Sequence, residues 1–179
     1  MPVVLKAGLQ IQYATEGRGR PVVLIHSSVS GNRQWRVLTE ELRDRYRVLA
    51  VNLYGYGETT PWPGAEPRSL AAQAGLILAL CDELGEPVQL VGHSFGGSVA
   101  LTSALVLDGR CDGLVLLEPN PFHLLRQGGR AGAWLEIVGL LAEGCPRWSF
   151  RSLAEGGHMA PLTRPELVNP IVREFLDAA

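Results

Sequence analysis

A serine flanked by glycines constrains this chain more than any other feature of its sequence. Gly92, Ser94 and Gly96 form a G-x-S-x-G pattern, preceded by apolar residues 87–91 and followed by small, helix-compatible residues 98–105. The pattern predicts a strand, a sharp turn and a helix, with Ser94 at the turn. Both glycines are required because the turn crowds strand against helix, and a Cβ would collide there. We therefore expect Ser94 to project as a nucleophile at the helix N-terminus, where negative charge is stabilised.

Apolar runs and amphipathic segments alternate along the rest of the chain. We expect strands at residues 3–5, 9–14, 22–25, 47–52, 87–91, 114–117 and 148–153, and helices at 33–43, 69–84, 98–105, 121–127, 130–143 and 163–175. Ser69 is a candidate N-cap, and Thr163 with Glu166 forms a candidate capping box. Continuous apolar strands indicate burial on both faces. The sequence therefore predicts an α/β fold, with a mostly parallel sheet, helices on both faces and functional loops at the carboxyl ends of the strands.

Length and composition indicate one domain spanning residues 1–179, with 46% hydrophobic residues to fill its core. A net charge of -2 gives no reason to expect a nucleic-acid or membrane partner. The sequence shows no signal peptide and no apolar run of membrane-spanning length, so we expect a cytoplasmic protein. The three cysteines are odd in number and lack metal-ligand spacing, so we interpret them as reduced and structural.

Five segments carry a family resemblance. They are residues 22–26, 47–57, 90–97, 114–119 and 156–161, and they are distributed in order over nearly the whole chain. With these motifs the sequence resembles the α/β-hydrolase fold family, in particular the serine hydrolases of its esterase branch and of its C–C and epoxide-hydrolase-like branch. The resemblance implies a hydrolase that needs no cofactor and no metal and that acts on a small-molecule substrate.

The resemblance also implies roles for individual residues. Ser94 corresponds to the nucleophile and His158 to the general base. The backbone N–H of Phe95 corresponds to one oxyanion donor, and that of Ser28, or alternatively Ser27, to the other. His26 opens the oxyanion loop and is expected to brace it through its side chain.

The chemistry of serine supports the choice of His158 independently. A serine hydroxyl is a weak nucleophile that must pass its proton to a neighbouring base, and histidine is suited to this near neutral pH. His158 alone of the four histidines lies late in the chain, in a glycine-rich loop after an expected strand, which matches the order serine, acid, histidine. His93 adjoins the nucleophile and is expected to point elsewhere, and His123 is interpreted as a structural residue of a helix.

The acid of the triad is less determined by the sequence. Carboxylates between Ser94 and His158 are Asp108, Asp112, Glu118, Glu136, Glu143 and Glu155. Glu118 is the preferred candidate because it follows a strand at the end of the sheet where Ser94 also emerges, and neighbouring strands lie about 4.8 Å apart. Glu155 is the alternative, and a site without a working acid is the third possibility.

The chain also departs from the family pattern. It has almost no room for the lid and the penultimate strand of the family, which indicates an internal deletion with a junction near residues 138–139. Asn52 stands where the family often has aspartate, and Ser27 where it often has glycine. A missing lid would expose apolar residues, namely Phe122, Leu124, Leu125 and Trp134. We therefore expect a homodimer, or exchange of the helix at residues 130–143 between two copies.

Three functions remain open at this point. The first is a serine hydrolase of small esters or other acyl substrates. The second is a catalytically impaired remnant, or a non-catalytic binding protein, that retains the fold. The third is a C–C bond hydrolase, whereas epoxide hydrolysis is disfavoured because it uses a carboxylate nucleophile where this chain has Ser94.

Overall fold

The centre of the molecule is a mixed β-sheet. The computed structural model describes residues 2–6, 8–62, 64, 69–119, 149, 151, 153 and 155–179. Across these residues the sheet has six strands in the order β1-β2-β4-β3-β5-β6. Their bounds are β1 Val3–Lys6, β2 Leu9–Glu16, β3 Arg20–Ile25, β4 Tyr46–Val51, β5 Val88–His93 and β6 Cys111–Leu117. Strands β3 to β6 run parallel, while β1 and β2 pair in the antiparallel sense.

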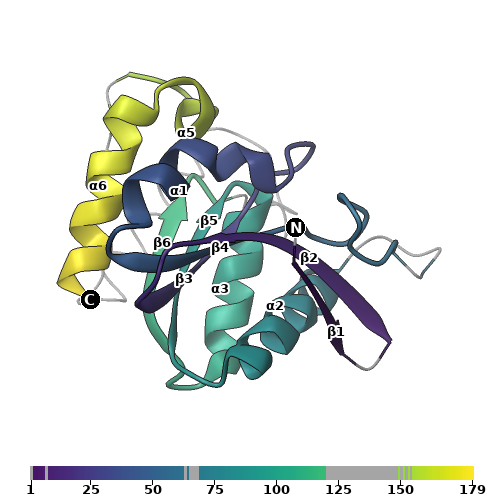
Figure 1. Cartoon of the computed structure of the whole chain (residues 1–179). Helices are drawn as coiled ribbons and strands as arrows, with labels where there is room; N and C mark the ends of the chain where they lie inside the picture. The colour runs from purple at the N-terminus through teal and green to yellow at the C-terminus, as the bar shows by residue number, and fades with distance from the viewer. Residues whose placement is uncertain are drawn as a thin grey trace.

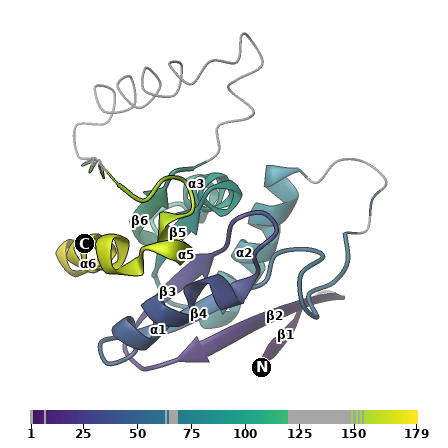
Figure 2. The same cartoon turned by 90° about the horizontal axis from the view of Figure 1, so that it is seen from above.

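Helices cover both faces of this sheet, as Figures 1 and 2 show. One face carries α1 and α6, and the other carries α2 and α3. The described helices are η1 Asn32–Trp35 (a 3₁₀ turn), α1 Arg36–Leu42, α2 Leu70–Leu84, α3 Phe95–Leu107, α5 Ala160–Thr163 and α6 Pro165–Ala178. None of them is long and apolar enough to cross a bilayer. The predicted α/β architecture is confirmed.

The hydrophobic core has two layers because the side chains of a strand alternate between its faces. In β3, Val23 and Ile25 enter the layer beneath α2 and α3, while Val22 and Leu24 enter the layer beneath α1 and α6. All four are fully buried. Burial of a side chain of this size stabilises the fold by about 1.5–3 kcal/mol. The helices on both faces of the sheet therefore contribute to its stability. This explains why β3 is apolar at consecutive positions.

Helix α2 begins and ends at the capping residues that the sequence predicts, Ser69 and Gly85. The Ser69 hydroxyl accepts a hydrogen bond from the backbone N–H of Ala72 at 3.1 Å. Gly85 closes the helix in the left-handed conformation, with φ 67°, which a glycine adopts without steric penalty.

The expected capping box at Thr163 and Glu166 is wrong. Thr163 is instead the last residue of α5, and its hydroxyl donates to the Met159 carbonyl at 3.1 Å. A proline disfavours helical geometry in the residue before it, and Arg164, which precedes Pro165, has φ −137° and ψ 54°. The chain therefore breaks at Arg164, and α6 begins with Pro165.

Other expectations fall partly outside the described residues. Of the strand expected at 148–153, the structure describes only Ser149, Arg151 and Leu153, and none of the three belongs to a strand. The helices at 121–127 and 130–143, the junction near 138–139, and the apolar residues proposed to drive dimerisation lie outside the described part of the chain. The homodimer or helix exchange therefore stays a prediction.

Candidate active site

The turn between β5 and α3 has the sharp geometry that its sequence predicts. Ser94 adopts φ 54° and ψ −118°, a backbone conformation that is uncommon for a residue with a side chain. A Cβ on Gly92 would overlap the Gly96 carbonyl, and a Cβ on Gly96 would overlap the carbonyl oxygens of Ile25 and His26. The two glycines therefore let strand, turn and helix pack at backbone contact, with Ser94 largely buried at 5% exposure.

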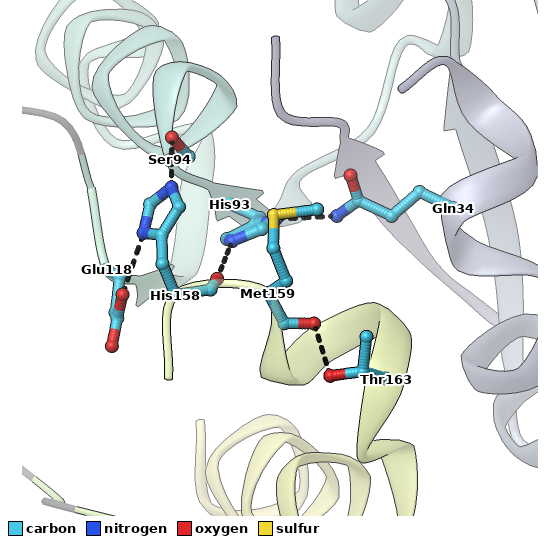
Figure 3. A network of polar contacts seen from close by, with 7 residues as sticks. All are labelled: Gln34, His93, Ser94, Glu118, His158, Met159 and Thr163. Carbon is cyan, nitrogen blue, oxygen red and sulfur yellow. Dashed lines mark hydrogen bonds and ion pairs between the residues drawn. The ribbon is translucent and has the colours of Figure 1, made fainter. Parts of the chain in front are cut away.

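Ser94, His158 and Glu118 come together beside this turn (Figure 3). Nε2 of His158 lies 2.9 Å from Oγ of Ser94, and Nδ1 of the same ring lies 2.7 Å from Oε2 of Glu118. A carboxylate only accepts hydrogen bonds, so Nδ1 carries the proton and Nε2 is free to accept the Ser94 hydroxyl proton. The sequence-predicted nucleophile and base, and the preferred acid, thus form one connected chain of hydrogen bonds.

Glu118 reaches this position because β5 and β6 are adjacent and in register. His93 pairs with Leu117, so the residue after each strand emerges at the same level of the sheet. Glu118 itself has φ 41°, a left-handed conformation that turns the chain sharply at the strand end. A Cβ on Gly97 would lie 2.8 Å from Cβ of Pro119, so glycine there lets the turn after Glu118 pack against α3.

The hydrogen-bonded series Ser94–His158–Glu118, here called the relay, faces solvent on its outer side. The side chains of His158 and Glu118 are 52% and 53% exposed. Water therefore screens the interaction between carboxylate and imidazole more than it would in a closed site.

The two backbone N–H groups predicted as oxyanion donors belong to the start of α3 and to the loop after β3. Phe95 is the first residue of α3, so its N–H has no partner within the helix. On the facing loop, Nδ1–H of His26 donates to the Ser27 carbonyl at 2.7 Å, and Nε2 accepts the N–H of Leu53 at 3.1 Å. A trans peptide directs its N–H opposite to its carbonyl. His26 therefore fixes the direction of the Ser28 N–H, in line with its expected bracing role.

His26 can hold both bonds because it stays uncharged. The side chain is fully buried, and this burial lowers the pKa of His26 to about 4. A proton on Nε2 would abolish the bond from Leu53.

Asn52 provides a second support for the oxyanion loop. Its Oδ1 accepts the N–H of Asn32 at 2.8 Å, and its Nδ2 donates to Oε1 of Gln12 at 2.6 Å. Aspartate would satisfy the first contact but has no N–H for the second. The asparagine at this position is thus matched to Gln12 on β2.

Comparison with known proteins establishes the family. A model of the alpha/beta hydrolase family matches residues 22–177. The chain belongs to this family.

Relatives of this alpha/beta hydrolase include several kinds of hydrolase. It is 37% identical to lipase LipV of Mycobacterium tuberculosis over 109 residues, which cover 60% of this chain and 40% of that protein. It is 36% identical to the 2-hydroxy-6-oxo-2,4-heptadienoate hydrolase of Pseudomonas putida over 121 residues, which cover 64% and 43%. A soluble epoxide hydrolase of a Corynebacterium is 34% identical over 116 residues, covering 64% and 40%. The chain therefore spans less than half the length of these relatives.

Solved structures agree with the fold. A meta-cleavage product hydrolase from Pseudomonas fluorescens superimposes with a TM-score of 0.60 at 34% identity, over 66% of this chain and 45% of that one. An epoxide hydrolase from Vigna radiata gives a TM-score of 0.61 at 28% identity, over 64% and 38%.

The remaining candidate residues of this member of the alpha/beta hydrolase family do not join the hydrogen bonds between Ser94, His158 and Glu118. Glu155, the alternative acid, forms an ion pair with Arg164 at 3.8 Å. Asp108 ends α3 and Asp112 pairs with Arg20, both at the opposite end of the sheet. Glu136, Glu143 and His123 are outside the described residues. Within the described part of the chain, no group of three or more histidine, cysteine and carboxylate side chains is arranged to hold a metal ion.

The sequence did not indicate a role for Gln34, and His93 was set aside as a residue that points away from the nucleophile. His93 is fully buried and connects the side chain of Gln34 to the main chain of His158 (Figure 3). Its place next to Ser94 was a signal that it lies at the site, but no local pattern identified its partners, because Gln34 is 59 residues away.

Proposed function

We propose that this hydrolase is a cofactor-free serine hydrolase that cleaves small esters or related acyl substrates. The observation that carries the proposal is the hydrogen-bond relay from Ser94 through His158 to Glu118, at 2.9 and 2.7 Å. This arrangement has the three roles that nucleophilic acyl transfer requires: a hydroxyl, a base within reach of its proton, and an acceptor that orients the base.

The reaction proceeds in two halves. Oγ of Ser94 attacks the ester carbonyl while Nε2 of His158 takes its proton, and the N–H groups of Phe95 and Ser28 stabilise the oxyanion. His158 then gives the proton to the leaving alcohol, which leaves an acyl group on Ser94. In the second half His158 takes a proton from water, the resulting hydroxide attacks the acyl group, and the proton returns to Ser94 as the acid product departs. Glu118 stabilises the imidazolium in both halves.

Small, short-chain substrates fit this proposal best. The half-exposed side chains of His158 and Glu118 leave the site open to solvent on their side, although Ser94 itself is largely buried. An open site binds weakly and discriminates little, because selectivity depends on buried contacts. We therefore expect turnover of acetyl and butyryl esters with high KM.

Labelling with a fluorophosphonate and turnover of p-nitrophenyl acetate test the proposal. The parent should be labelled on Ser94, Ser94→Ala should lose all labelling, and His158→Ala should slow turnover by roughly 10³-fold or more. Ser103→Ala is the matched control, because Ser103 is buried in α3, the helix that Ser94 precedes, and its hydroxyl donates to the Val99 carbonyl. A folded parent without labelling would instead support the impaired or non-catalytic alternative.

C–C bond hydrolysis is the second candidate. It is favoured by the Pseudomonas putida relative and by the likeness to a meta-cleavage product hydrolase. A ring-fission dienoate offered beside p-nitrophenyl acetate separates the two, since a C–C hydrolase would turn over the dienoate with the higher kcat/KM.

A further inference from the structure

The two halves of the site are joined behind the relay by a second chain of hydrogen bonds. Oε1 of Gln34 accepts from both the backbone N–H and the hydroxyl of Ser27, each at 3.0 Å. Nε2 of Gln34 lies 3.1 Å from Nδ1 of His93, and Nε2 of His93 lies 2.7 Å from the backbone carbonyl of His158. This series of hydrogen bonds thus links the oxyanion loop to the backbone of His158, through Gln34 in η1 and His93 at the end of β5.

The donor and the acceptor of each hydrogen bond in this series follow from the two backbone groups at its ends, the N–H of Ser27 and the carbonyl of His158. A backbone N–H can only donate, so the atom of Gln34 that faces Ser27 is its carbonyl oxygen, and its NH₂ group faces His93. Nδ1 of His93 is therefore an acceptor. The His158 carbonyl can only accept, so the proton of His93 is on Nε2. One tautomer of His93, in its neutral form, satisfies both contacts.

The surroundings of His93 support the same form. The side chain is fully buried, and burial lowers its pKa below the ordinary value for histidine. The charged or titratable groups near the ring are His158 and Glu118, and the two histidine rings lie 5.1 Å apart. A neutral His93 also avoids placing a second positive charge beside the imidazolium that forms during catalysis.

We propose that Gln34 and His93 are positioning residues, which fix the main chain of His158 relative to the oxyanion loop by a directed chain of hydrogen bonds. This inference rests on the proposed function. His158 has a half-exposed side chain in a loop with glycines at positions 156 and 157, so its own surroundings restrict it weakly. The bond from His93 holds that loop at the residue whose ring must reach Ser94.

Kinetics of paired variants test the role of His93. His93→Gln keeps a donor near the His158 carbonyl, while His93→Leu has similar bulk and no donor. We expect His93→Leu to lower kcat for p-nitrophenyl acetate by roughly 10- to 100-fold, because the base is misplaced, with KM changed less than threefold. His93→Gln should recover most of that loss. Ser103→Ala, with a similar loss of one buried hydrogen bond, should leave kcat unchanged.

Nuclear magnetic resonance of the ring nitrogens tests the chain without any catalysis. The parent should show His93 protonated on Nε2 only, with slow exchange of that proton. Gln34→Glu replaces the donor facing Nδ1 by an acceptor, so His93 should gain a proton on Nδ1.

These measurements separate failure of this proposal from failure of the proposed function. An active parent in which His93 carries its proton on Nδ1, or in which His93→Leu matches His93→Gln in kcat, overturns the positioning role alone. An unlabelled Ser94 overturns the function, and the tautomer of His93 still decides whether the directed chain exists.

Discussion

The backbone N–H of Ser94 donates a hydrogen bond to the carbonyl oxygen of Leu117, 2.9 Å away. Leu117 is the last residue of β6, and Glu118 follows it directly. The proposed nucleophile and the proposed acid are therefore fixed to each other by a backbone hydrogen bond at the ends of two neighbouring strands. His158 has only to bridge two groups that the sheet has already aligned.

Glu118→Gln tests the acid. Glutamine can still accept from Nδ1 of His158, but it lacks the charge that stabilises the imidazolium, so we expect kcat to fall roughly 10²- to 10⁴-fold. The smaller end of this range reflects the solvent exposure of both side chains. Steady-state hydrolysis of p-nitrophenyl acetate measures the effect, with Glu155→Gln as the matched control. Equal turnover of Glu118→Gln and parent would remove Glu118 from the triad.

Gly96→Ala and Gly75→Ala should act in opposite directions. A Cβ at Gly96 overlaps backbone carbonyl oxygens, whereas a Cβ at Gly75 meets nothing within 4 Å. We expect Gly96→Ala to destabilise the fold by about 1–3 kcal/mol and to reduce labelling of Ser94. Gly75 lies within α2, where alanine should stabilise by about 0.5–1 kcal/mol. Urea unfolding of both variants measures the difference, and a stable, fully active Gly96→Ala would contradict the tight turn.

Stability should fall with acidification because of His26. Its pKa is about 4 in the folded chain, against 6.5 ordinarily. Between these values the unfolded chain binds a proton that the folded chain does not, so stability decreases as pH falls through this window, by up to about 3 kcal/mol. The lowered pKa of His93 acts in the same direction. Urea unfolding at about pH 7 and about pH 5 measures how the free energy of unfolding changes with pH. This change should be smaller in His26→Gln than in the parent, and an equal change in the two proteins would contradict the prediction.

Cys81 should be unreactive in the folded protein. Burial raises the pKa of its thiol to about 12, so almost no thiolate forms near neutral pH. Alkylation by iodoacetamide, followed by mass spectrometry, should modify Cys81 only after urea is added. Rapid modification of Cys81 in the native protein would show that the layer beneath α2 opens.

The strands and the turn that hold Ser94 were predictable because local sequence patterns determine them. The glycines around Ser94 indicate a sharp turn, and the apolar runs of β3 and β5 indicate buried strands. Strand adjacency made Glu118 the preferred candidate for the acid but left Glu155 open. The start of α6 was misassigned because Thr163 and Glu166 fit a capping box, although Pro165 was the stronger signal. The series of hydrogen bonds that links Ser27 to His158 could not be predicted. Gln34 contacts His93 because η1 packs against the sheet, and no local sequence pattern indicates that packing.

Glu118 and His158 are 40 residues apart in the sequence. None of Ser94, Glu118 and His158 comes from residues 120–154, so all three are encoded on either side of that interval. A change of length or sequence confined to that interval therefore leaves the identity of these three residues unchanged.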